Sequence, residues 1–247
     1  NVVYVVSGDT ENNIENAIGG IEGLGLASGN GGSISLPLES GKVERKWHNS
    51  NLGVDWDAVK NIALPILSKY TARANGSYVK LTSSSIGWSY YSCDPEWGSL
   101  LASHLVVEME NELHGFDIRL VTLKGVIEVV PRKLNKGLAV KEILRNSDLP
   151  DFILCMGDDV SDEKMFTSVF SLIAQSSAEK VINSGGDTSV PNYAFTVTVG
   201  KKPSNASYYL GNAEDVANLL IKMSGDQALR KGSKSWDMDD ITQSMFA

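Results

Sequence analysis

The chain has 247 residues, 42% of them hydrophobic and 21% charged, so it is apolar enough to fold and long enough for one large domain or two modest ones. Its 22 basic and 30 acidic residues give a formal net charge of −8, which argues against a broad basic face for duplex nucleic acid. No apolar run reaches the ~18 residues that a membrane-spanning helix needs. Two cysteines are too few for a disulfide framework, and we expect a reducing, cytoplasmic setting.

Apolar segments bounded by turn residues alternate with helical patterns at both ends of the chain. Continuous rather than alternating apolar strands are typical of a parallel sheet that is covered on both faces, so we predict a doubly wound α/β core. Because a domain rarely begins directly with a core strand, we also expect a first core strand upstream of residue 1. The predicted elements of the core are strands over residues 2–6, 24–27, 152–156 and 194–199 and helices over residues 9–18, 138–144, 161–170 and 213–223, with a loop over 28–32.

The middle of the chain has a different pattern. It contains predicted helices over 57–70 and 94–113 and predicted strands over 78–81, 86–90, 117–122 and 126–131. The last two strands follow one another directly, which favours antiparallel pairing. We therefore predict a core made of residues 1–35 and 135–225, an inserted α/β cap over 36–134, and a flexible tail over 226–247.

An acidic segment directly follows the apolar strand over residues 152–156. Asp158, Asp159 and Asp162 lie where ligands gather in α/β proteins, outside the carboxyl end of a strand. Carboxylate oxygens at such an edge predict a Mg²⁺ site. The alternative is that acids such as Asp162 and Glu163 merely stabilise the dipole of the helix that begins there.

Two further segments favour phosphate binding. Lys136 stands at the start of a predicted helix, where its charge opposes the helix dipole but would attract a phosphate. The alternative for Lys136 is a solvated lysine in a turn. Ser7-Gly8 follows the first predicted strand and offers a hydroxyl and a flexible backbone at the same edge of the sheet, a weak signal by itself.

These segments occur in the order strand–Ser, Lys at a helix start, and strand–Gly-Asp-Asp, which resembles the later three motifs of haloacid-dehalogenase-like phosphatases. The surrounding residues resemble the trehalose-6-phosphate phosphatase family, and especially the phosphatase-like C-terminal half of trehalose-phosphate synthase fusions. The resemblance covers about residues 2–224. It rests on Val126–Pro131, Asn135–Val140, Phe152–Phe166 and Phe195–Leu210, with Gly76-Ser77 and Asp94–Gly98 matching the cap of that family.

The resemblance implies a Mg²⁺-dependent phosphomonoesterase that converts trehalose 6-phosphate to trehalose through an aspartyl-phosphate. It implies that Ser7 binds the phosphate, Lys136 stabilises charge on the phosphoryl oxygens, and Asp162 fixes the metal shell. Metal ligation is assigned to Asp158, Asp159 and Asp162, and the remaining substrate contacts to Gly8, Asn30, Glu128 and Asn135. The implied partners are a sugar phosphate and a fused upstream synthase domain, with neither nucleic acid nor a membrane.

The chain also departs from the family. It lacks the nucleophile motif Asp-x-Asp-Gly-Thr, and Asp237-Met238-Asp239 follows no apolar strand, so we expect the chain alone to be inactive. Each lost polar sugar contact leaves an unpaired group at a cost of ~1–3 kcal/mol, so we expect weak or absent hydrolysis of trehalose 6-phosphate in the parent protein as well. The family's polar residues are replaced by Gly29, Lys80, Thr82, Ser89, Tyr91 and Val130.

Three functions stay open from the sequence. The first is a phosphatase domain of trehalose biosynthesis. The second is a non-catalytic domain that regulates or stabilises a fused synthase. The third is a different haloacid-dehalogenase-like phosphatase that acts on another sugar phosphate. In the parent protein, an alternative to poor substrate positioning is a pocket rebuilt around Lys80 and Tyr91 for trehalose 6-phosphate or another sugar phosphate.

Overall fold

The computed structural model describes residues 1–145, 150–184 and 193–225. The chain forms two compact units, residues 1–139 and residues 140–247. The predicted flexible tail over 226–247, which includes Asp237-Met238-Asp239, lies outside the described residues. The predicted division into a discontinuous core and a cap over 36–134 stays a prediction.

The first unit begins with a four-stranded sheet in the order β1-β2-β3-β4. β1 (Val3–Val6) and β2 (Leu24–Ser28) are parallel and are connected by α1 (Glu11–Ile18), as the apolar runs predict. After a short 3-10 turn at Gly29–Gly31, β3 (Ser33–Ser35) and β4 (Trp47–Asn49) add two antiparallel strands. These two strands are not predicted from the sequence, because three residues are too few to show an apolar period.

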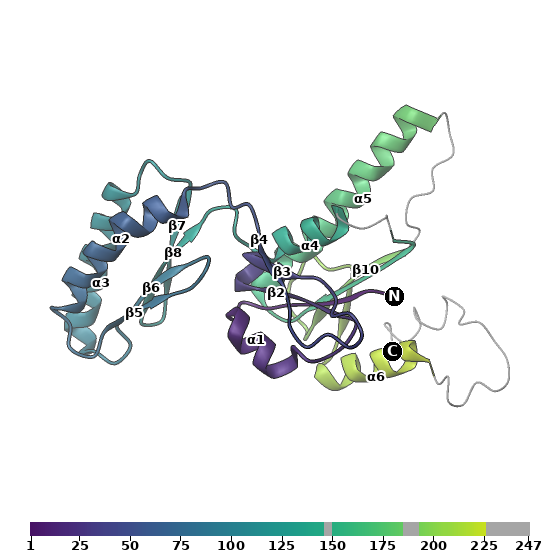
Figure 1. The fold of residues 1–247 in the computed structure, drawn as a ribbon, viewed down its shortest axis with the longest axis horizontal. Coiled ribbons are helices and arrows are strands. Elements are labelled where there is room, and N and C mark those ends of the chain that lie inside the picture. Colours follow the sequence, from purple (N-terminus) through teal and green to yellow (C-terminus); the bar gives the residue numbers. More distant parts are fainter. Residues whose placement is uncertain (146–149, 185–192, 226–247) are drawn as a thin grey trace. The chain divides into compact units, whose positions relative to one another are not determined.

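The second sheet of this unit is antiparallel throughout, which confirms the pairing predicted for the two successive strands. Its order is β5-β6-β8-β7. Two helices, α2 and α3, cover one face of this sheet (Figure 1). The core between the helices and the sheet includes the fully buried Leu67, Trp88, Leu105 and Ile127. The elements are α2 (Trp56–Thr71), β5 (Tyr78–Leu81), β6 (Ile86–Ser89), α3 (Pro95–Glu112), β7 (Ile118–Leu123) and β8 (Val126–Pro131).

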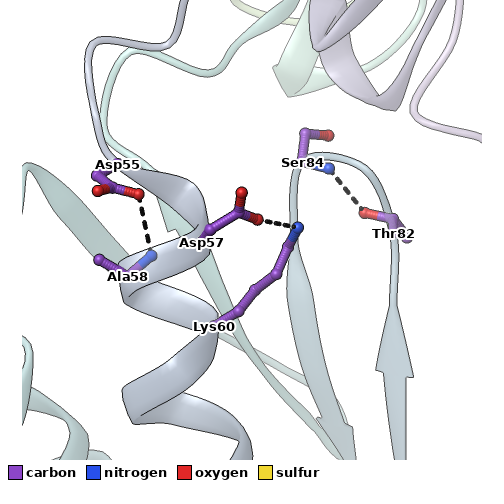
Figure 2. Close-up of polar contacts among 6 residues, drawn as sticks. All are labelled: Asp55, Asp57, Ala58, Lys60, Thr82 and Ser84. Carbon is purple, nitrogen blue, oxygen red and sulfur yellow. Dashed lines mark hydrogen bonds and ion pairs between the residues drawn. The ribbon is translucent and has the colours of Figure 1, made fainter.

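Short-range hydrogen bonds fix the start of α2 and the hairpin between β5 and β6 (Figure 2). Asp55 caps α2 by accepting from the Ala58 amide at 3.0 Å, which satisfies one of the backbone donors left open at a helix start. In the hairpin, the Thr82 hydroxyl accepts from the Ser84 amide at 3.3 Å and from the Ser85 amide at 2.8 Å. These bonds hold the hairpin tip in a fixed shape.

The second unit contains a parallel three-stranded sheet in the order β11-β10-β9. Its strands are β9 (Phe152–Gly157), β10 (Tyr193–Val199) and β11 (Tyr208–Leu210), and its helices include α5 (Glu163–Ser184) and α6 (Ala213–Ser224). In the sequence, α4 (Lys136–Arg145) spans the boundary between the two units. Parallel strands joined by helices confirm the predicted α/β class. Among the described residues, no helix has the length and apolarity to cross a membrane.

Candidate functional site

Backbone and side-chain hydrogen bonds hold the turn after β1 in place. Ser7 is half-buried and donates its amide to the carbonyl of Ala27 at 2.9 Å, so the turn is anchored to the end of the parallel neighbour β2. The Ser7 hydroxyl accepts from the Asp9 amide at 3.1 Å. Its oxygen therefore lies at the carboxyl edge of the sheet, where the sequence places a phosphate contact.

The loop Gly29–Gly31 brings the Ser7 turn beside the residues that follow β2. Asn30 adopts the left-handed conformation (φ 57°, ψ 32°), and its amide donates to the Ser7 carbonyl at 3.0 Å. The Asn30 side chain lies against Gly8, where an added Cβ would be 3.2 Å from its Oδ1 atom. Three of the predicted site residues, Ser7, Gly8 and Asn30, therefore lie together.

The same loop packs on the start of α4. A Cβ added at Gly31 would lie 3.1 Å from the Asn135 carbonyl oxygen and 3.0 Å from the Ala139 amide nitrogen. Glycine at position 31 thus allows the close approach of loop and helix. Lys136, the first residue of α4, is half-buried at this junction. Asn135 and Lys136 are therefore linked to Ser7 through one loop, and their roles stay predictions.

Sequence reasoning missed a contact of this loop with the β5–β6 hairpin. The Ser84 side chain, whose residue is 2% exposed, donates to the Gly29 carbonyl at 3.4 Å. A Cβ at Gly29 would lie 2.7 Å from the Ser84 hydroxyl oxygen, and one at Gly32 would lie 2.6 Å from it. Ser84 thus fills the space that a side chain at position 29 would need. The glycines at 29, 31 and 32 are the sequence signal for such a close approach.

The strands of the second sheet place Glu128 in a row of aligned residues. Strand pairing sets Lys80 opposite Gly87, Gly87 opposite Glu128, and Glu128 opposite Val121. Because side chains alternate between the two faces of a strand, this row lies on the face opposite Trp88 and Ile127, which belong to the core beneath the helices. Lys80 and Glu128 are therefore on one face, separated by a glycine.

In the second unit, the acidic turn after β9 uses two of its carboxylates for local structure. Asp159 caps the short turn Val160–Asp162, and its amide donates to the Asp162 carboxylate at 2.9 Å. Asp162 is only 3% exposed, and a Cβ at Gly157 would lie 2.4 Å from its Cβ. Glycine at the end of β9 thus makes room for the buried aspartate. Asp159 and Asp162 therefore form a capping box that shapes the turn, a role distinct from the dipole stabilisation considered as the alternative for Asp162.

Asp158 differs from these two, because it is exposed and its carboxylate makes no hydrogen bond within the described residues. Among those residues, no three His, Cys, Asp or Glu side chains gather in a group able to hold a metal ion. Mg²⁺ needs fewer protein ligands, since it commonly keeps several waters and takes one or two carboxylates together with a substrate phosphate. The donor chemistry at Asp158 and Asp162 therefore fits Mg²⁺, and the assignment stays a prediction.

Glu163, the first residue of α5, holds a loop that follows β10. Its carboxylate accepts from the Ser204 hydroxyl at 2.6 Å and from the amide and side chain of Asn205 at 2.7 and 2.9 Å. Desolvation raises the pKa of Glu163, but these hydrogen bonds and the charge of Lys202 outweigh it and leave that pKa below its ordinary value. Lys202 also donates to the carbonyl of Asp158. From the sequence alone, Glu163 is predicted only to stabilise the helix dipole.

Cys155 lies within β9, three residues before Asp158, and is not a nucleophile. Burial raises the pKa of its thiol to about 12, and the nearby charge of Asp162 adds to the effect. Since the thiolate is the reactive form, Cys155 is a neutral, structural residue at physiological pH.

Comparison with solved structures defines the fold of the protein. A haloacid dehalogenase-like hydrolase from Bacteroides thetaiotaomicron matches 89% of this chain and 86% of its own at a TM-score of 0.57 and 14% identity, a likeness of fold alone. The C-terminal domain of the trehalose-6-phosphate phosphatase of Candida albicans matches 91% of this chain and 79% of its own, with a TM-score of 0.65 and 24% identity. The fold is therefore haloacid-dehalogenase-like.

The family follows from the sequence match. The trehalose-phosphatase family profile matches residues 1–214, so the chain belongs to this family. UDP-forming alpha,alpha-trehalose-phosphate synthase 5 of Arabidopsis thaliana is 32% identical over 226 residues, which are 89% of this chain and 24% of the plant protein. A trehalose-phosphatase of Schizosaccharomyces pombe is 28% identical over 89% of this chain and 27% of its own length. The chain thus spans about a quarter of the length of these relatives.

Proposed function

We propose that this domain acts in trehalose biosynthesis and binds a sugar phosphate, trehalose 6-phosphate by family, at a Mg²⁺-dependent phosphatase-type site. The observation that supports this most is the family match together with the two clusters that follow parallel strands. One cluster joins Ser7, Asn30 and Lys136, and the other carries Asp158.

Each residue has a definite part in this proposal. Ser7 donates its hydroxyl hydrogen to a phosphate oxygen, and the Lys136 ammonium at the start of α4 balances the phosphate charge. Asp158 holds the metal ion with its exposed carboxylate, while buried Asp162 keeps the turn in shape. Bound Mg²⁺ would supply a positive charge that neutralises phosphoryl oxygens.

A non-catalytic, regulatory role is the second candidate, and it has specific support. The relatives include proteins named trehalose-phosphate synthases, of which the chain spans about a quarter. We propose that this domain is likewise fused to a synthase in the cytoplasm. The Ser84 hydroxyl occupies the space beside Gly29, where the family has an acid, and the cap residues Lys80 and Thr82 also depart from the family pattern. These changes favour binding or regulation over turnover.

The metal assignment can be tested by calorimetric titration of the chain with Mg²⁺. Asp158→Asn removes one proposed ligand and should weaken Mg²⁺ binding by at least about tenfold. Asp151→Asn is the matched control, because Asp151 is an exposed aspartate at the opposite end of the same strand. Equal affinity of the Asp158→Asn and wild-type chains would remove Asp158 from the metal site.

The ligand can be tested in the same way. We expect trehalose 6-phosphate to bind in the presence of Mg²⁺ and trehalose itself to bind far more weakly, since Ser7 and Lys136 contact the phosphate in the proposal. Preferential binding of another sugar phosphate would indicate a rebuilt pocket that includes Lys80. Binding of neither would contradict the proposed function.

A further inference from the structure

The loop between β10 and β11 carries the residues Gly200-Lys201-Lys202-Pro203-Ser204-Asn205, to which the proposed function gives no role. The loop begins where β10 ends, and Thr198 of β10 pairs in register with Gly157 of β9. Since β9 and β10 are parallel, the loop leaves the sheet at the same edge as Asp158. The two segments therefore start side by side.

Two sets of hydrogen bonds connect this loop to the acidic turn. On one side, the Glu163 carboxylate accepts from Ser204 and Asn205 at 2.6–2.9 Å. On the other side, the Lys202 ammonium donates to the carbonyl of Asp158. The loop is thus attached both to the residue that follows the acidic turn and to the residue that begins it.

The local geometry makes Glu163 more than a favourable first-turn acid. A carboxylate that only stabilised the dipole of α5 would need no partner outside the helix. Both of its oxygens instead accept from the loop, and charge-assisted hydrogen bonds of this kind are stronger than neutral ones. The Ser204 hydroxyl, in turn, accepts from the Ala206 amide at 3.0 Å, which fixes the loop internally.

We propose that Glu163 is a positioning residue that, through Ser204, Asn205 and Lys202, holds the Asp158 backbone in place at the end of β9. The inference rests on the proposed function, because it gives the loop the task of presenting the Asp158 carboxylate to Mg²⁺. Partners behind a metal ligand commonly change metal affinity by about 10–100-fold when they are removed.

The test compares variants by amide hydrogen exchange and by Mg²⁺ titration. Glu163→Gln keeps the size of the side chain but removes its charge and one of its two acceptor oxygens, so the hydrogen bonds to the loop are weakened. We expect faster exchange at Asn205, whose amide loses a charged acceptor. We also expect at least about tenfold faster exchange at Asp159 and roughly tenfold weaker Mg²⁺ binding.

Two further variants distinguish the positioning of Asp158 from a general effect of removing a helix-start charge and from the anchoring of the loop alone. Glu214→Gln makes the same change in the first turn of α6 and should alter neither readout. Lys202→Met keeps Glu163 but removes the donor to Asp158. It should speed exchange at Asp159 and leave Asn205 unchanged, and it carries the test if Glu163→Gln fails to fold.

The outcomes are distinct. Unchanged exchange at Asp159 in both variants would overturn the inference, since Glu163 would then only anchor its loop. Unchanged Mg²⁺ affinity in Glu163→Gln, with a wild-type chain that binds the ion, would overturn it as well. Faster exchange at Asp159 in a chain that binds no Mg²⁺ would uphold the positioning role and contradict the metal part of the proposed function.

Discussion

At the scale of single residues, Gly29 shows how the backbone of the candidate site depends on glycine. Its φ is +54°, in the left-handed region, and the space beside it is filled by the Ser84 hydroxyl. The left-handed conformation costs a residue with a Cβ roughly 1–2 kcal/mol. A side chain at position 29 would therefore be strained and would also displace Ser84.

Gly29→Ala should lower the free energy of unfolding by about 1–2 kcal/mol, measured by urea denaturation. Gly20→Ala is the control, because a Cβ there meets no atom within 4 Å and Gly20 is not among the residues with positive φ. We expect that change to be neutral or slightly stabilising. Equal effects of the two substitutions would show that neither φ nor Ser84 constrains position 29.

At the scale of elements, α2 and α3 are joined by a polar cluster beside their apolar contact. Glu108 of α3 accepts from the Lys69 ammonium and from the Tyr70 hydroxyl of α2, the latter at 3.0 Å. The hydrogen bond from Lys69 lowers the pKa of Glu108, desolvation opposes it, and the hydrogen bond from Tyr70 adds to the lowering. Glu108 thus binds its proton less tightly in the folded protein than in the unfolded chain.

Because folding lowers the pKa of Glu108, the contribution of this residue to stability depends on pH. It is fully present above the ordinary value of 4.5 and is lost as the pH falls through the lowered pKa. Because the pair is partly exposed, we expect the effect to be ~0.2–1 kcal/mol. Glu108→Gln should therefore reduce the loss of unfolding free energy between pH 7 and pH 3. Glu110→Gln, an exposed change on the same helix, should not, and an unaltered loss in Glu108→Gln would contradict the linkage.

At the scale of the whole molecule, we expect the chemical groups within residues 1–247 to limit what this chain does alone. Residues 1–247 contain no Asp-x-Asp-Gly-Thr segment, and the thiol of Cys155 is neutral at physiological pH. Phosphoryl transfer in the proposed mechanism needs an in-line nucleophile, and we expect neither Ser7 nor the carboxylates around Asp158 to replace it.

We therefore expect the purified chain to release no phosphate from trehalose 6-phosphate at an enzymatic rate, with or without Mg²⁺. A colorimetric phosphate assay measures this release. An Asp158→Asn chain purified by the same procedure serves as the control for contaminating phosphatase. Mg²⁺-dependent release by the wild-type chain that is lost in Asp158→Asn would contradict the expectation.

The sequence by itself determined the α/β class, the antiparallel pairing of β7 and β8, and the family. Continuous apolar runs and motif order are local features that survive without coordinates. The same holds for the acidic turn, since Asp158 directly follows an apolar strand. The sequence could therefore nominate candidate site residues and predict that Ser7 and Asp158 follow the ends of strands.

The tertiary structure alone decided which residues meet. Ser84 lies 55 positions from Gly29, and Glu163 lies 41 positions from Ser204, so no local pattern connects either pair. The short polar strands β3 and β4 also form only by pairing with β2 and with one another. Contacts between distant segments depend on which strands pair in the sheets and so on which loops lie side by side. Strand pairing depends on the whole sequence and is not encoded in any single motif.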